Sequence, residues 1–151
     1  MRETDPYLWR RANIGRVLFD AARRFEECIH ATVQAAGFWD VRFVHLTLTR
    51  NMNPDGTRLT DLAARAGVTK QAMAQIVDEC EARGIVVRRP DPSDGRARIV
   101  TFTPRGRALL EAVHAGVGRA EAEMHAAIGK RETTRIAAAL HSYCDAGDGN
   151  G

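Results

Sequence analysis

The first part of the chain carries apolar residues at steps of three and four. The positions that fall together on one face of a helix are Leu18, Ala21, Ala22, Phe25, Ile29 and Val33. The pattern predicts a helix from Pro6 to about Ala36, where Gly37 can end it. About thirty residues is long for a helix in a small domain, so we expect a partner for it, either in its own chain or in a second subunit.

A shorter helix is expected next, because Asp40 can cap an N-terminus. The segment 51–56, Asn-Met-Asn-Pro-Asp-Gly, is a strong turn signal that ends this helix. The residues predicted to form its inward face are Phe43, Val44, Thr47 and Leu48.

Two further short helices are separated by only a brief turn. Thr60 can cap the first, which Gly67 ends, and Thr69 can cap the second, which runs to about Arg83. Two short helices joined by a glycine-centred turn form a helix-turn-helix. The side chains of the second helix that are expected to pack inward are Met73, Ile76, Val77 and Cys80.

After Gly84 the hydrophobic period changes from that of a helix to that of a strand. The alternation predicts strands over residues 85–89 and 97–102. The segment 90–95 contains two prolines and a glycine, so it is expected to be the loop between them. A helix-turn-helix followed directly by a two-stranded hairpin is a winged helix.

The rest of the chain is helical again. Thr103 can cap, and Pro104 begin, a helix whose apolar stripe reaches about Ile128. Gly129 interrupts the pattern, and a last helix is predicted over residues 132–143. The sequence therefore predicts a mainly α fold with a small β-hairpin wing, in which a winged helix-turn-helix is flanked by helices from both ends of the chain.

Positive charge is concentrated around the predicted wing. The formal net charge of the chain is +3, whereas residues 83–107 hold seven arginines and two acidic residues, a local charge of +5 that leaves −2 for the remainder. A cationic stripe beside a near-neutral remainder is typical of a DNA-binding surface.

Three segments of the chain resemble the MarR (multiple antibiotic resistance regulator) family: residues 59–72, 77–84 and 88–106. The most specific part is Asp-Gly-Arg at 94–96, followed by Thr-Pro-Arg-Gly at 103–106. The resemblance implies a homodimer in which the first helix and the last two join the subunits and hold two winged helices over one pseudo-palindromic DNA site. It also implies that a small aromatic or phenolic ligand releases the DNA, with repression the commoner outcome.

The expected organisation follows. Residues 1–36 and 104–146 form a helical dimerisation region, 37–103 a winged helix-turn-helix DNA-binding domain, and 147–151 a flexible tail. Dimerisation is also expected on physical grounds. A long amphipathic helix at each end of the chain has more apolar surface than the small winged helix can cover. The expected partners are double-stranded DNA, a second copy and a small effector.

The start of the second helix of the helix-turn-helix is expected to enter the major groove. Gln71 and Gln75 can each pair with an adenine edge, and the methyl group of Ala74 can contact a thymine methyl. Thr69 and Lys70 suit phosphate oxygens. The family often has serine and arginine in place of Ala74 and Gln75, so the preferred bases are left open.

In the wing, Arg96 and Arg98 are two residues apart and should project from one face of the strand. The resemblance assigns the minor groove to Arg96, and we expect Arg98 or Arg89 to contact phosphates. Asp94 is expected to orient an arginine within the wing, because a carboxylate facing DNA would repel its backbone.

The effector site is the least determined. The residues considered for a ligand pocket at the hinge are Phe38, Trp39, Phe43 and His45, although an aromatic cluster at such a junction is also typical of a plain core. A thiol switch at Cys28 is a second option, which Glu26 and Glu27 disfavour because carboxylates raise a thiol pKa.

Other classes of protein are disfavoured. The three cysteines, Cys28, Cys80 and Cys144, form no CxxC pair, and the five histidines show no HxH or HxxxH spacing, so no metal or cofactor is expected. The chain has no GxxxxGK[ST], GxSxG or HExxH motif, so we expect no enzyme. No apolar stretch approaches the ~20 residues of a membrane span, no secretory signal is visible, and we expect a cytosolic protein. A winged helix that binds only proteins remains an alternative, but it predicts an apolar or acidic wing.

Overall fold

The computed structural model describes residues 7–148. Its elements in chain order are a 3-10 turn (Leu8–Arg10), α1 (Ile14–Ala35), α2 (Phe43–Asn51), β1 (Thr57–Arg58), α3 (Leu59–Ala66), α4 (Lys70–Ala82), β2 (Val86–Asp91), β3 (Asp94–Phe102), α5 (Pro104–Ile128) and α6 (Lys130–Asp148). The predicted mainly α fold with a β-hairpin wing is confirmed. Among these residues no helix is both long and apolar enough to cross a membrane.

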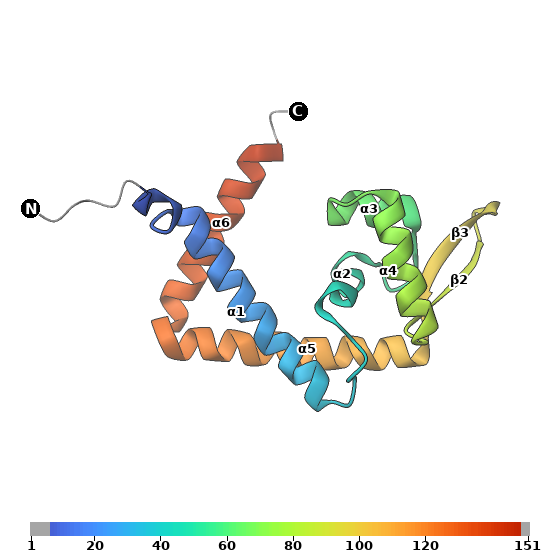
Figure 1. Ribbon diagram of the computed structural model, residues 1–151, viewed down its shortest axis with the longest axis horizontal. Helices are drawn as coiled ribbons and strands as arrows, with labels where there is room; N and C mark the ends of the chain where they lie inside the picture. The colour runs from blue at the N-terminus through green and yellow to red at the C-terminus, as the bar shows by residue number, and fades with distance from the viewer. Residues whose placement is uncertain (1–6, 149–151) are drawn as a thin grey trace, which may run out of the picture.

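Helix α5 joins the two halves of the molecule (Figure 1). Its first turns lie below α2, α3, α4 and the hairpin, whereas α1 crosses its middle and α6 rises from its C-terminal end (Figure 1). Helix α1 crosses α5 closely at Gly116, where a Cβ atom would lie 2.9 Å from Cα of Ile29. Glycine at this crossing lets the two backbones approach.

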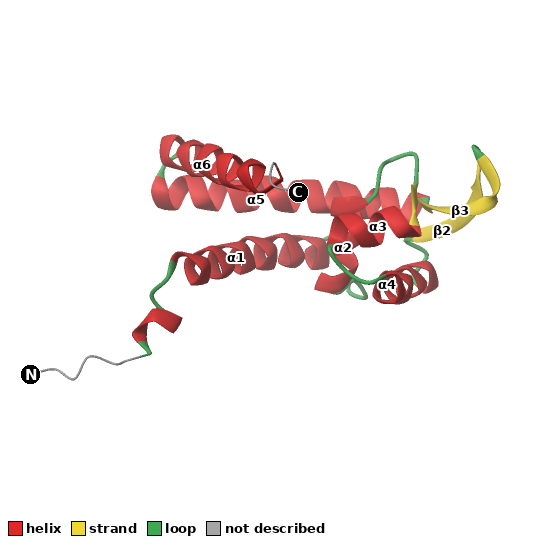
Figure 2. Cartoon of the chain, turned by 90° about the horizontal axis from the view of Figure 1, so that it is seen from above, coloured by secondary structure: helices red, strands yellow, loops and turns green. Residues whose placement is uncertain are grey.

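The core of the winged helix collects one apolar face from each element. Its most deeply buried side chains are Leu46, Leu48, Leu62, Met73, Val77, Ile85, Val86, Val100 and Leu109. The three strands form one antiparallel sheet in the order β1-β3-β2. The hairpin of β2 and β3 extends from the body as a free-standing wing (Figure 2).

Helix α1 begins later than predicted. Pro6 lies outside the described residues, and the helix starts at Ile14 because Asn13 caps it, its side chain accepting a hydrogen bond from the backbone N–H of Arg16 at 2.9 Å. The Asn13 amide also donates to the carbonyl of Trp9 at 2.7 Å. Asparagine is a strong N-cap, and this signal was missed.

Helix α2 also differs from the prediction, and its predicted inward face is wrong in part. Asp40 does not cap it; the helix starts at Phe43, after Arg42. Phe43 and Val44 are exposed, whereas His45, Leu46 and Leu48 are buried. The face that packs on the core is therefore the one that carries His45, Leu46 and Leu48.

The third and fourth helices are close to prediction. Thr60 is not a cap, because α3 already begins at Leu59, directly after the short strand β1 that pairs with β3. A strand of two residues carries no periodicity that the sequence could reveal. The predicted cap at Thr69 is confirmed: its hydroxyl accepts from the N–H of Ala72 at 3.1 Å. Gly67 ends α3 in the left-handed conformation with φ of 65°.

The hairpin is longer than predicted, since residues 90, 91, 94 and 95 belong to the strands and only Pro92 and Ser93 join them. Pro90 is tolerated because β2 is an edge strand of the sheet. At the C-terminus, α6 is longer than residues 132–143 and continues to Asp148, so it includes the first two residues of the predicted tail; residues 149–151 lie outside the described chain.

Candidate nucleic-acid interface

Helix α4 presents its polar side chains to solvent and its apolar ones to the core. Met73, Val77 and Cys80 are fully buried, and Ile76 is half-buried against the core. Of the five candidate contact residues, Ala74 is half-buried and the exposed ones are Thr69, Lys70, Gln71 and Gln75. The turn at Gly67 and the cap at Thr69 fix the start of α4 on α3, so the exposed residues belong to a rigid helix end.

The wing displays three exposed arginines. Arg96 and Arg98 stand on the same face of β3 as the buried Val100 nearer the sheet. Arg89 stands on the other face, opposite Ile99. The carboxylate of Asp94 accepts the backbone N–H of Arg96 at 3.1 Å, so Asp94 orders the backbone where Arg96 begins.

The four other arginines of the cationic stretch are engaged within the protein. Arg83 donates to the carbonyl oxygens of Asp40 and Glu79, and Arg107 donates to that of Phe102. Arg105 pairs with the Asp40 carboxylate at 2.7 Å, and this contact lowers the pKa of Asp40.

Arg88 is held by Asp78 and Glu81. In contrast, within residues 7–148 the side chains of Arg89, Arg96 and Arg98 make no hydrogen bond or ion pair, nor do those of Lys70, Gln71 and Gln75. Apart from Thr69, whose hydroxyl caps α4, the polar side chains predicted for DNA are therefore ones that the fold leaves unpaired.

Comparison with known proteins decides the family. A sequence model of the MarR family matches residues 49–97. HTH-type transcriptional repressors of Mycobacterium tuberculosis and Mycobacterium bovis are 32% identical to the chain over 113 residues, which are 75% of this chain and 80% of the relative. The chain belongs to the MarR family.

Solved structures agree with this assignment. The transcriptional repressor CouR, bound to a 23-mer DNA duplex, superimposes with a TM-score of 0.71 at 25% identity, covering 94% of this chain and 99% of that chain. CouR from Rhodococcus jostii RHA1, bound to p-coumaroyl-CoA, gives a TM-score of 0.70 at 25% identity over 87% of this chain and 92% of that chain. This MarR-family protein is therefore a DNA-binding transcriptional regulator with a repressor fold, and not an enzyme.

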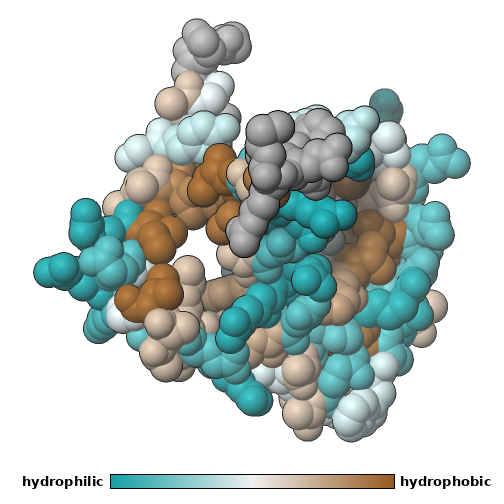
Figure 3. Space-filling view, turned by 60° about the vertical axis from the view of Figure 1, so that its left-hand side comes forward, coloured by the Kyte–Doolittle hydropathy of each residue, from teal (hydrophilic) through white to brown (hydrophobic). Residues whose placement is uncertain are grey.

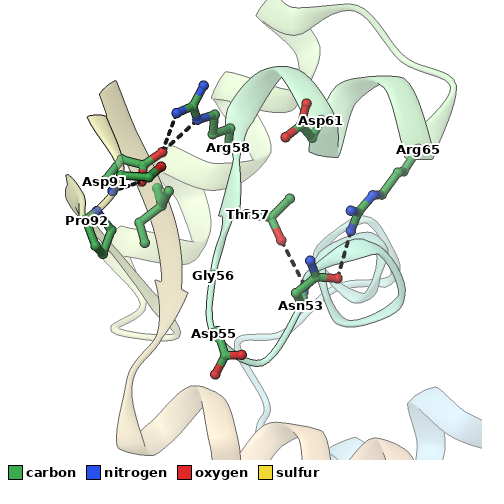
Figure 4. Close-up of a pocket in the computed structure, with 11 residues that line it drawn as sticks. Asn53, Asp55, Gly56, Thr57, Arg58, Asp61, Arg65, Asp91 and Pro92 are labelled. Atoms are coloured by element: carbon green, nitrogen blue, oxygen red, sulfur yellow. Dashed lines mark hydrogen bonds and ion pairs between the residues drawn. The ribbon is translucent and has the colours of Figure 1, made fainter. Parts of the chain in front are cut away.

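The tip of the wing in this MarR-family chain holds an ion pair that the sequence did not indicate. Arg58, at the end of β1, contacts the Asp91 carboxylate through Nε at 2.7 Å and Nη2 at 2.6 Å (Figure 4). Ser93 donates to the same carboxylate from its N–H and hydroxyl, at 2.8 and 2.7 Å. The hydrogen bonds from Ser93 and Arg58 lower the pKa of Asp91 to about 2. The wing tip is therefore tied to β1.

A polar cavity of about 370 Å³ lies beside this ion pair (Figure 4). Arg65 reaches into it from α3 and donates to Asn53 Oδ1 at 3.0 Å, and the Asn53 N–H donates to Thr57 Oγ1 at 2.9 Å. These contacts fix the loop that carries β1 to the edge of β3.

A buried histidine joins α2 to α4. The His45 ring is almost completely buried; its Nδ1 accepts the N–H of Arg42 at 3.1 Å, so its proton sits on Nε2, which donates to Glu79 at 2.9 Å. Arg42 also pairs with Glu79. Burial lowers the pKa of His45, and the hydrogen bonds from His45 and Arg42 lower the pKa of Glu79 to about 2.

This arrangement predicts a loss of stability in mild acid. Unfolded His45 takes up a proton below its ordinary pKa of about 6.5 and the folded ring resists it, so stability falls from pH 7.5 to pH 5 by at most about 1.4 kcal/mol per unit for this residue. Glu79, with a pKa of about 2 when folded against 4.5 ordinarily, contributes only below pH 4.5. Urea unfolding at a series of pH values should show a flatter slope for His45→Gln. The exposed His141→Gln should keep the wild-type slope, and an equal slope for both variants would contradict the assignment.

The four residues considered for a ligand pocket are not gathered around one cavity. Phe38 packs against the core below the Arg105 guanidinium, Trp39 is 73% exposed, and Phe43 stacks on His30 with ring centroids 4.3 Å apart. His45 is occupied on both ring nitrogens. None of the four lines the polar cavity beside Arg58 or a second, mainly apolar cavity between α1 and α5.

The surroundings of Cys28 and Cys80 do not favour a reactive thiolate. The Cys28 thiol donates to Glu123 at 3.5 Å, and burial and this carboxylate raise its pKa; the sequence neighbours Glu26 and Glu27 are not the groups in contact. Burial raises the pKa of Cys80 to about 12. Cys144 is exposed on α6. Across residues 7–148 no three histidine, cysteine or carboxylate side chains gather as metal ligands.

Proposed function

We propose that the protein is a homodimeric, sequence-specific repressor that binds a pseudo-palindromic operator and is released by a small ligand. The observation that carries the proposal is the set of exposed, unpaired polar side chains on α4 and the wing. Gln71, Ala74 and Gln75 read base edges in the major groove, and Arg96 enters the minor groove. Thr69, Lys70, Arg89 and Arg98 contact phosphates.

Dimerisation is supported by apolar surface on the terminal helices. None of the side chains of residues 130–147 is buried, although α6 presents Ile136, Leu140 and Tyr143 to solvent. The first half of α1 likewise exposes Ile14 and Val17, at 74% and 58%. Apolar side chains line an open hollow on this side of the molecule (Figure 3). A second copy that covers both helices would bring two winged helices onto one DNA duplex.

Release by a ligand is supported by the CouR structure with bound p-coumaroyl-CoA. In this chain the aromatic side chains of Phe38, Trp39 and Phe43 lie where α1 passes into the reader, and Trp39 and Phe43 are exposed. His45 packs behind them against α4. A ligand that binds here would act directly on the joint between the helical region and the recognition helix.

Selection of bound duplexes from a random pool tests the proposal. Two half-sites in inverted orientation are expected, with centres about 10 bp apart, and affinity should fall steeply with salt. Arg96→Ala should weaken binding to the selected operator about 10- to 100-fold and leave the melting temperature unchanged. Binding is measured by fluorescence anisotropy at physiological salt.

Arg131→Ala is the matched control, because Arg131 is also an exposed arginine and lies on α6. It should bind the operator within about twofold of wild type. The proposal fails if the wild-type chain binds no duplex at any salt concentration, which is the result expected of a protein-only adaptor. The role of Arg96 fails if its replacement leaves operator affinity unchanged.

A further inference from the structure

One arginine joins the wing to the recognition helix. The guanidinium of Arg88, in β2, donates to Asp78 at 2.6 Å and to Glu81, and its backbone N–H donates to Glu81 at 3.0 Å. Asp78 and Glu81 are three residues apart on α4, so they stand on the same side of the helix and one guanidinium can bridge both. We call these three residues the wing clamp.

One residue of the wing clamp lies on the face of α4 that carries the candidate base contacts. Asp78 follows Gln71 and Gln75 at helical steps of four and three, so all three side chains lie on one stripe of the helix. A carboxylate on a surface that approaches DNA repels phosphates. We therefore expect a contact of Asp78 whose benefit outweighs this repulsion.

The hairpin geometry indicates that role. Arg88 pairs with Val100, which alternates along β3 with Arg98 and Arg96, so the clamp and the wing arginines share one face. Pro92 at the tip is four residue steps beyond Arg88, about 13 Å of strand, and a rotation of about 10° at Arg88 would move the tip by about 2 Å. That displacement exceeds the tolerance of a hydrogen bond.

We propose that Arg88, held by Asp78 and Glu81, is a positioning residue for DNA recognition. The clamp sets the angle of the wing against α4, so that Arg96 and the α4 glutamines engage neighbouring grooves at the same time. Arg88 itself contacts no DNA. This inference rests on the DNA-binding function proposed above.

Loss of the clamp leaves the wing folded. The β2–β3 ladder and the contact of Arg58 with Asp91 hold the hairpin independently of Arg88. The carboxylates left behind are accessible to water, since the Asp78 and Glu81 side chains are 67% and 36% exposed. Clamp variants should therefore fold, with the wing still held at β1 and no longer held at α4 by Arg88.

The Asp78→Ala variant distinguishes two roles of this carboxylate, because they predict opposite changes in operator affinity. If Asp78 only repels DNA, its removal tightens binding to every duplex. If the clamp positions the wing, binding to the selected operator weakens about 5- to 10-fold, whereas binding to a random duplex is unchanged or up to about threefold tighter. Glu121→Ala removes an exposed carboxylate from α5 and should leave the ratio of the two affinities unchanged.

A double-mutant cycle with Arg96→Ala measures the positioning directly. With the clamp intact, Arg96→Ala should cost about 10- to 100-fold in operator affinity, and in the Arg88→Met background it should cost less than about threefold. The salt dependence of binding to a random duplex should be the same for Arg88→Met and wild type, because no phosphate contact is lost.

The outcomes separate the two proposals. Wild-type binding with an undiminished cost of Arg96→Ala in the Arg88→Met background would overturn the clamp and leave the DNA-binding function standing. Tighter operator binding by Asp78→Ala would also overturn the clamp alone, and this variant decides if Arg88→Met fails to fold in a thermal melt. No binding by the wild-type chain would overturn both.

Discussion

Replacing Gly106 with alanine is expected to destabilise the protein severely. A Cβ atom at this position in the first turn of α5 would lie 2.0 Å from the carbonyl oxygen of Ile85 and 3.0 Å from the Phe102 ring. The Ile85 carbonyl cannot easily withdraw, because it accepts hydrogen bonds from the N–H and the hydroxyl of Thr103, both at 3.0 Å. Because this clash is with backbone, we expect a loss of about 3 kcal/mol or more in unfolding free energy.

Thermal unfolding followed by circular dichroism measures the effect. A loss of this size should lower the melting temperature by about 6–12 °C or more. Gly118→Ala, on the same helix with open space around its Cα, is the matched control and should stabilise the protein by up to about 1 kcal/mol through helix propensity. Equal melting temperatures for Gly106→Ala and wild type would show that α5 is not docked on the start of β2 in this way.

The same glycine shows what the sequence could and could not reveal. Thr103 and Pro104 predict the start of α5 by local chemistry, and the structure confirms it, because the Thr103 hydroxyl accepts the N–H of Gly106 at 3.0 Å. The reason for Gly106 itself is a contact with Ile85, which lies on the other side of the hairpin. Local patterns therefore predicted the helix, and only the packing explains its glycine.

The roles of the charged residues were also predictable only in part. The sequence located the cationic stretch, but its net charge overstates the surface available to DNA. Arg105 finds Asp40, 65 residues earlier, and Arg83 binds the same loop. Such partners depend on how the chain folds back, so no spacing rule could assign them. The exposed wing arginines were predictable because strand alternation places Arg96 and Arg98 on one face.

The hinge depends on contacts that local patterns could not predict. Sequence reasoning grouped His45 with aromatic residues as a candidate pocket, whereas the structure buries His45 as the link between α2 and Glu79, 34 residues away. Over the nine residues of α2 the apolar positions repeat too few times to define one face, and the start of the helix was predicted from the wrong cap.

The second large effect is expected at α6. Replacing both Ile136 and Leu140 with glutamate should convert the protein to a monomer and weaken operator binding by at least about 100-fold. These side chains lie on one face of a helix that buries no residue in its own chain, and charges there would prevent a second copy from covering them. Binding would weaken because a dimer places its second reader at a high effective concentration, which two separate monomers lack.

Sedimentation velocity gives the oligomeric state of this variant, and anisotropy with the selected operator gives its affinity. Ala138→Glu with Ser142→Glu adds the same charge to the opposite face of α6 and should remain a dimer that binds like wild type. The binding of the Ile136 and Leu140 variant to a single half-site should stay within about threefold of wild type, because its reader is intact. A variant that still sediments as a dimer would place the subunit interface elsewhere on the molecule, and a wild-type chain that sediments as a monomer on the operator would remove the dimer from the proposal.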